Sequence, residues 1–191
     1  TLGLSGHHQF LESYTINFEL NKSITNEPNN DWIENEGFIK NRSLKLDGES
    51  YSGDAFFLNL RRTSVNWESS LGYEQLSPLY RTPLGFSIQN SSKNIFFSQN
   101  YIYYGDNFIQ RATIGADLEW QFNYDDLQKN GGIQVEAELV MKKNIETRAE
   151  FNYQFNNEFE GFNPKNLNSF GWFIGYNPSE IVRLRFAFGM G

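Results

Sequence analysis

The stretch that decides the fold runs from Ala112 to Asp125 and reads A-T-I-G-A-D-L-E-W-Q-F-N-Y-D. Its even positions, from Ala112 to Tyr124, are all apolar or aromatic, and its odd positions, from Thr113 to Asp125, are polar, charged or Gly. Side chains of an extended strand point alternately to opposite faces, so this period of two predicts a strand with one apolar and one polar face. At fourteen residues it is more than twice the usual strand length of about six.

The same alternation recurs along most of the chain. The other apolar sets are Val65, Trp67, Ser69, Leu71 and Tyr73; Ile133, Val135, Ala137, Leu139 and Met141; Ile145, Thr147, Ala149, Phe151, Tyr153 and Phe155; and Val182, Leu184, Phe186, Phe188 and Met190. Together with the 112–124 set, these 28 positions carry no charge, whereas 14 of the 27 interleaved positions are charged. This segregation predicts sheets with one apolar face.

Ten antiparallel strands are expected, separated by links that alternate in length. The expected strands are 10–20, 33–46, 54–62, 65–75, 85–104, 107–125, 132–142, 145–156, 169–176 and 181–190. From the third strand onward, short links alternate with longer ones such as 76–84 and 157–168. Tight turns at one end and longer loops at the other are typical of outer-membrane β-barrels.

Two turns test whether the apolar faces stay in register. A two-residue Gly105-Asp106 turn would place Tyr104 opposite Asn107 and Tyr103 opposite Phe108, which keeps apolar positions together. Between Met141 and Ile145 a three-residue loop, Lys142-Lys143-Asn144, is needed to preserve the faces. That loop predicts Glu138 opposite Arg148.

Composition bounds the class of protein. The 191 residues fit one domain, 1–191, which we expect to be a barrel or a barrel segment excised from a longer chain. A mean hydropathy of -0.58 and the lack of a long apolar run exclude a membrane helix but not a membrane barrel. The net charge of -7 argues against nucleic acid, and the absence of Cys removes disulfides and thiol chemistry.

Aromatic residues lie near the ends of several expected strands, where a bilayer interface would favour them. Trp and Tyr girdles flanking an aliphatic band are typical of membrane barrels. The expected interface aromatics are Trp67, Trp120, Tyr124, Tyr153 and Trp172. The alternative is a soluble β-sandwich or barrel that uses its aromatic side chains to bind carbohydrate or lipid.

The charged residues of the polar faces are expected to line a hydrated lumen. These candidates are Arg111, Asp117, Glu119, Glu136, Glu138, Arg148, Glu150, Arg183 and Arg185. Two of the carboxylates could also imitate a glycosidase acid pair, but pairing with the arginines is the simpler interpretation. His7 and His8 are neighbours on a strand and point to opposite faces, so they form no joint site. We therefore expect no catalysis, no cofactor and no bound metal.

One segment carries a specific resemblance. Its pattern is roughly Gly-Tyr-x-x-Leu/Ile-Ser-Pro-x-aromatic-Arg-x-x-x-Gly-Phe, which is built here from Gly72, Tyr73, Ser77, Pro78, Arg81, Gly85 and Phe86. Together with Tyr51–Ala55 upstream, it resembles the C-terminal barrel domain of Bacteroidetes-type outer-membrane proteins that carry an N-terminal, family-nine-like carbohydrate-binding module. Pro83-Leu84 departs from the family's pattern. The resemblance implies an outer-membrane barrel, with glycans bound by a module outside this chain.

The sequence thus predicts an all-β, antiparallel, up-and-down transmembrane barrel, or a segment of a larger one, with about ten strands. Its expected location is the outer membrane of a Gram-negative bacterium, where lipid is its partner. The expected function is passage, anchoring or surface display linked to glycan handling. A soluble β-protein binding carbohydrate or lipid is the alternative, and a barrel hydrolase using lumen carboxylates is a third hypothesis.

Overall fold

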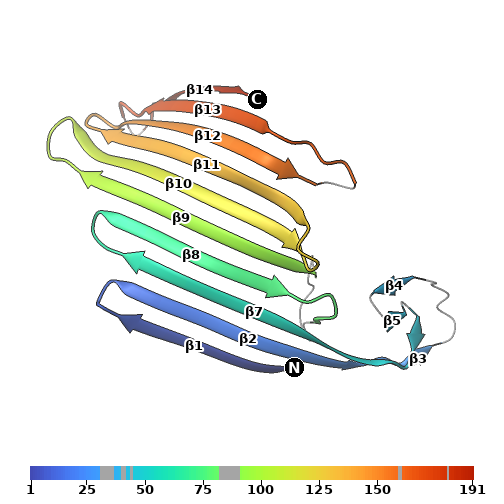
Figure 1. Ribbon diagram of the computed structural model, residues 1–191. Coiled ribbons are helices and arrows are strands. Elements are labelled where there is room, and N and C mark those ends of the chain that lie inside the picture. Colours follow the sequence, from blue (N-terminus) through green and yellow to red (C-terminus); the bar gives the residue numbers. More distant parts are fainter. Residues whose placement is uncertain (31–36, 40–41, 44, 82–90, 159–160, 180) are drawn as a thin grey trace.

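The computed structural model describes residues 1–30, 37–39, 42–43, 45–81, 91–158, 161–179 and 181–191. Ten strands form one sheet (Figure 1). They are β1 (Leu2–Phe10), β2 (Tyr14–Asn26), β7 (Ser50–Thr63), β8 (Trp67–Leu76), β9 (Ser92–Tyr104), β10 (Ile109–Asn123), β11 (Gln128–Met141), β12 (Ile145–Asn157), β13 (Leu167–Tyr176) and β14 (Leu184–Met190). Two short pairs lie apart from it: β3 (Asn29–Asn30) with β6 (Leu46–Asp47), and β4 (Phe38–Ile39) with β5 (Arg42–Ser43).

The sheet is an antiparallel meander, as predicted. Each of its strands pairs with the strands that precede and follow it within the sheet, and no strand crosses over. The sheet is not closed in the described part of the chain, because β1 and β14 form its two opposite edges (Figure 1). The all-β, antiparallel, ten-stranded prediction is therefore confirmed.

Two of the ten expected strands are wrong. The expected strand 10–20 is broken by a turn in which Leu11 and Glu12 have positive φ angles of 46° and 57°, so that β1 and β2 form a hairpin. In place of the expected strand 33–46, the described residues form only the short pairs β3–β6 and β4–β5, and residues 31–36 lie outside the described part. The main sheet still contains ten strands, because β1, which the sequence analysis did not predict, makes up for the missing strand 33–46.

The registers show which turn predictions hold. Met141 lies opposite Ile145 and Glu138 opposite Arg148, so the three-residue turn 142–144 is confirmed, with Lys143 and Asn144 both at positive φ. The two-residue Gly105-Asp106 turn is wrong, because Tyr104 lies opposite Arg111. The displacement from the expected register is an even number of residues, so apolar side chains still lie opposite apolar ones.

The register divides the sheet into two faces that extend across all ten strands. We call the face that contains Leu118 the apolar face and the face that contains Asp117 the polar face. Across the sheet, Phe97, Leu118, Ile133 and Tyr153 lie in one line of partners, and Ser98, Asp117, Gln134 and Asn152 lie in the next. The 112–125 alternation thus continues sideways into the neighbouring strands.

Within the described part of the chain, neither face is covered by a second layer of structure. The accessible surface is 13192 Å², whereas a compact monomer of this mass would expose about 9,400 Å². Among the described hydrophobic residues only Tyr80 is buried, with 6% of its surface exposed. Side chains of the apolar face such as Ile114 and Phe186 remain exposed. The fold therefore leaves its apolar face exposed instead of burying it in a core.

Candidate functional site

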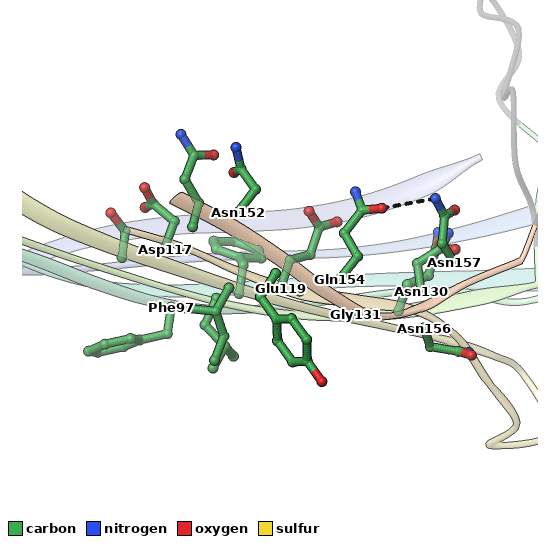
Figure 2. A pocket seen from close by; sticks show the side chains of 17 residues that line it. Phe97, Asp117, Glu119, Asn130, Gly131, Asn152, Gln154, Asn156 and Asn157 are labelled. Carbon is green, nitrogen blue, oxygen red and sulfur yellow. Dashed lines mark hydrogen bonds between the residues drawn. The ribbon is translucent and has the colours of Figure 1, made fainter. Parts of the chain in front are cut away.

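The candidate functional site is the central part of the polar face, on β10, β11 and β12. Figure 2 shows Asp117, Glu119, Asn152 and Gln154 pointing to one side of the sheet, and Phe97 pointing to the other. These polar groups come from three strands because the register aligns Asp117 with Gln134 and Gln134 with Asn152. Strand alternation alone therefore gathers the charged and carboxamide groups on one surface.

Two arginines of the polar face, Arg111 and Arg148, form ion pairs with neighbouring carboxylates. Arg111 contacts Glu138 at 2.5 Å, and Arg148 contacts Glu136 at 2.6 Å and Glu150 at 3.2 Å. Arg148 therefore bonds diagonally and along its own strand rather than to its directly opposite partner, Glu138. All of these groups are partly exposed, so each pair contributes at most about 1 kcal/mol to stability.

Asp117 and Glu119 differ from the other acidic lumen candidates because, within the described part of the chain, neither side chain makes a hydrogen bond or ion pair, whereas Glu136, Glu138 and Glu150 are paired with arginines. Both line a hollow of about 480 Å³ with polar groups from β11 and β12. The walls include the carboxamides Gln121, Asn130, Gln134, Asn152, Gln154, Asn156 and Asn157. Amides can hydrogen-bond water or a solute, but this set contains no activated nucleophile or acid–base pair in contact.

The two arginines expected near the C-terminal strand are placed differently. Arg185 lies in β14 on the polar face, opposite Gly175, with its guanidinium 5.9 Å from the centre of the Phe173 ring. Arg183 precedes β14 and belongs to the link 177–183. The strand prediction 181–190 was therefore three residues too long at its start.

The expected interface aromatics all lie on or beside the apolar face. Trp67 packs edge-on against Tyr101 at 5.8 Å, and Trp120 packs against Phe155 at 5.8 Å. Tyr153 hydrogen-bonds Asn166 through its hydroxyl group, and Trp172 donates its ring N–H to Thr147 at 3.0 Å. Trp172 lies in the middle of β13 rather than at an end.

A polar cluster marks one end of the apolar face, at the start of β9. Lys93 contacts Asp126 at 2.5 Å and lies 5.1 Å from the centre of the Tyr124 ring. Gln75 connects Tyr73 to Tyr124 through hydrogen bonds of 2.7 and 3.3 Å. A charged and phenolic cluster at the edge of an apolar surface is the arrangement found at a membrane–water interface.

The resemblance motif forms a loop that folds back onto β2 and β7, which sequence reasoning did not foresee. We call Ser23, Gly53, Ser77, Tyr80 and Arg81 the loop clasp. The Ser77 hydroxyl accepts from the Asp54 N–H at 2.7 Å, and the Ser23 hydroxyl accepts from the Arg81 N–H at 3.0 Å and donates to the Gly53 carbonyl. Gly53 is required because a Cβ there would lie 2.1 Å from the Tyr80 nitrogen.

The other motif residues have separate positions. Gly72 lies under the Phe96 ring on the polar face, where a Cβ would lie 1.9 Å from the ring, and Tyr73 belongs to the polar cluster described above. Pro78 follows Ser77 in the loop. Gly85 and Phe86 lie outside the described residues. The described motif residues Ser77 and Arg81 therefore anchor the loop to the sheet. The Ser77 hydroxyl bonds to the backbone of β7, and the Arg81 N–H bonds to Ser23 of β2.

Ser23→Ala is expected to weaken this anchor. Ser23 is only 2% exposed, and its hydroxyl group holds two backbone groups. Loss of that hydroxyl leaves the Arg81 N–H without its acceptor in a partly buried site, at a cost of about 1 kcal/mol. Limited proteolysis after Arg81 measures the effect and should be faster in the variant. Unchanged cleavage would show that the loop is held by other contacts.

The histidines and the acidic residues outside the sheet centre show no catalytic arrangement in the described part of the chain. His7 lies on the polar face with Nδ1 2.7 Å from Asn17 Oδ1, and His8 stacks on Phe10 across the apolar face. Sequence reasoning missed that Glu27, Asp47 and Glu49 come together, with carboxylate oxygens within 4.8 Å of one another. Only the pairing of distant residues, such as Glu27 N–H with Glu49 C=O, produces this cluster.

Comparisons with family models, curated proteins and solved structures find no match to this chain. The described residues include no helix that could serve as a transmembrane span.

Proposed function

We propose that this chain forms the wall of an outer-membrane β-barrel, with its apolar face against lipid and its polar face toward an aqueous interior. In this proposal it serves passage, anchoring or surface display and not catalysis. The single observation that carries the proposal is the exposed apolar face, which continues over ten strands with no covering layer among the described residues. A soluble monomer rarely exposes an apolar surface of this extent.

The apolar face carries a band of uncharged side chains, and the height of this band agrees with the thickness of the apolar part of a bilayer. On β10 the apolar side chains run from Ala112 to Phe122, a distance of about 34 Å along the strand. At a strand tilt of about 45°, this distance spans a height of about 24 Å, close to the apolar band of about 25 Å on outer-membrane barrels.

Charged residues on the apolar face lie near the boundaries of this band. They are Lys22, Asp54, Arg62 and Lys93. Lys22 and Asp54 are partners at the level where β8 ends, Arg62 is next to the last residue of β7, and Lys93 is the second residue of β9. Long basic side chains near a membrane boundary can extend to the headgroup region.

The lengths of the links support the same orientation. The links 11–13, 64–66, 105–108, 142–144 and 177–183 lie at one end of the sheet and have three to seven residues. At the other end, 27–49, 77–91 and 158–166 are longer, and 124–127 is a short exception. Membrane barrels have short periplasmic turns and longer external loops. The loop clasp belongs to the long-loop end, which we assign to the outside. The resemblance of Gly72–Phe86 to barrels joined to a sugar-binding module is the basis for linking this chain to glycans.

The proposal is tested by expressing the chain, with any flanking sequence, behind an outer-membrane export signal. We expect the protein in the outer-membrane fraction, folded only in detergent or lipid. A control expression without the signal and without detergent should give aggregated material. A folded, soluble monomer from that control would overturn the proposal and favour the alternative, a soluble β-protein that binds carbohydrate or lipid.

A further inference from the structure

The polar face carries an excess of negative charge. Within the paired strands, nine carboxylates lie on this face: Glu19, Glu68, Glu74, Asp117, Glu119, Glu136, Glu138, Glu146 and Glu150. Only four guanidinium groups share it: Arg61, Arg111, Arg148 and Arg185. The imbalance is a property of the whole face, because the carboxylates come from β2, β8, β10, β11 and β12.

The ion pairs do not remove this excess. Arg111 and Arg148 are both engaged with carboxylates, and Arg148 serves two of them, Glu136 and Glu150. Arg185 lies over the Phe173 ring, away from the centre of the face. The positive charges of β10 and β12 are therefore neutralised locally, whereas Asp117 and Glu119 remain unpaired beside an open hollow.

Resting on the proposed function, we infer that an interior lined by this face favours cations over anions. Charges of one sign on the wall of a narrow aqueous passage create a potential that concentrates ions of the opposite sign. Acidic linings favour cations in this way, and basic linings favour anions. The solute class is thus small inorganic cations or organic molecules with a positive charge. No bound ion is required, because the field of the whole face produces the preference.

The experiment is a measurement of reversal potential across planar bilayers that contain the purified full chain, with KCl at different concentrations on the two sides. We expect K⁺ to permeate several-fold better than Cl⁻ at about 0.1 M salt, where the screening length is about 10 Å. The preference should weaken at about 1 M, where that length falls to about 3 Å.

Two matched variants distinguish the polar face from the charge of the protein as a whole. The double variant Asp117→Asn/Glu119→Gln removes two unpaired charges from the face and should move the permeability ratio toward unity. The double variant Glu12→Gln/Asp106→Asn removes two charges from the short links beyond the strand ends, away from the polar face, and should leave the permeability ratio unchanged. Equal ratios in both double variants would overturn the inference.

The outcomes also separate this inference from the proposed function. Heat-dependent migration on gels first shows whether the protein has folded into the membrane. A folded, inserted protein that prefers Cl⁻, shows no preference or does not conduct would overturn the inference and leave the membrane proposal standing. A protein that does not insert at all would overturn the proposed function itself.

Discussion

Val135→Arg is expected to destabilise the protein in a bilayer by about 2–4 kcal/mol, the cost of an arginine on the lipid face near the midplane of a membrane barrel. Val135 lies on the apolar face between Ala116 and Phe151 and is 39% exposed. In water, an exposed site of this kind would tolerate the substitution within about 0.5 kcal/mol. The measurement is the free energy of unfolding by denaturant in lipid vesicles.

Gln134→Arg is the matched control for that variant. Gln134 is the preceding residue of β11, so it lies at the same depth but on the polar face, between Asp117 and Asn152. The Gln134→Arg variant adds the same charge on the polar face, where carboxylates are abundant, so we expect little loss of stability. Equal stabilities of the two variants in vesicles would contradict the assignment of the apolar face to lipid.

Gly53→Ala is expected to have the second large effect, a loss of about 3 kcal/mol. The added Cβ would lie 2.1 Å from the Tyr80 nitrogen and 2.3 Å from the Leu79 carbonyl carbon. These are backbone atoms, so no rotation of a flexible side chain can relieve the clash. The loop from Ser77 to Arg81 must move as a unit. The stability of the variant and the hydrogen exchange of the Arg81 amide, bonded to Ser23, measure the two effects.

Gly171→Ala provides the control for this substitution. Gly171 also lies in a strand, β13, and nothing lies within 4 Å of the position where its Cβ would be built. We expect its stability to change by less than about 1 kcal/mol, because only the backbone preference of Gly is altered. A comparable loss in both variants would show that the close approach of Tyr80 to Gly53 is unimportant.

Much of the sheet could be predicted because alternation is a local property of the sequence. The pattern 112–125 predicted β10 to within a few residues. The alternation in the sequences of β11 and β12 likewise predicted which of their residues lie on each face. The turn 142–144 was predictable because only a three-residue loop keeps Met141 and Ile145 on one face. The register that places Glu138 opposite Arg148 followed from that constraint.

The errors arose where alternation was weak or where a turn lacked its usual residues. β1 reads L-G-L-S-G-H-H-Q-F, in which Gly6 and His8 occupy apolar-face positions, so its pattern is faint. The following turn uses Leu11 and Glu12 at positive φ, where Gly or Asn would be the usual signal. At Gly105-Asp106 the dipeptide favoured a tight turn, but Tyr104 pairs with Arg111, which lies four residues further along the chain than the expected partner Asn107.

The contacts of the candidate site could be predicted only in part. Strand parity identified Asp117, Glu119, Glu136, Glu138, Arg148 and Glu150 as residues of one face, because it depends on sequence alone. Which carboxylate Arg148 contacts depends on rotamers of long side chains, and the structure selects Glu136 and Glu150. The loop clasp joins Ser23, Gly53 and Arg81, which lie far apart in the sequence, so no local pattern contained it.

The meander also determines how such a wall can change in size. Every strand of the main sheet pairs only with its predecessor and successor within the sheet, so one hairpin is a complete structural module. Removing or duplicating a pair such as β11 and β12 conserves the strand direction and the side to which each neighbouring residue points. The width of the sheet can therefore evolve in steps of two strands, while the chemistry of each face is inherited unchanged.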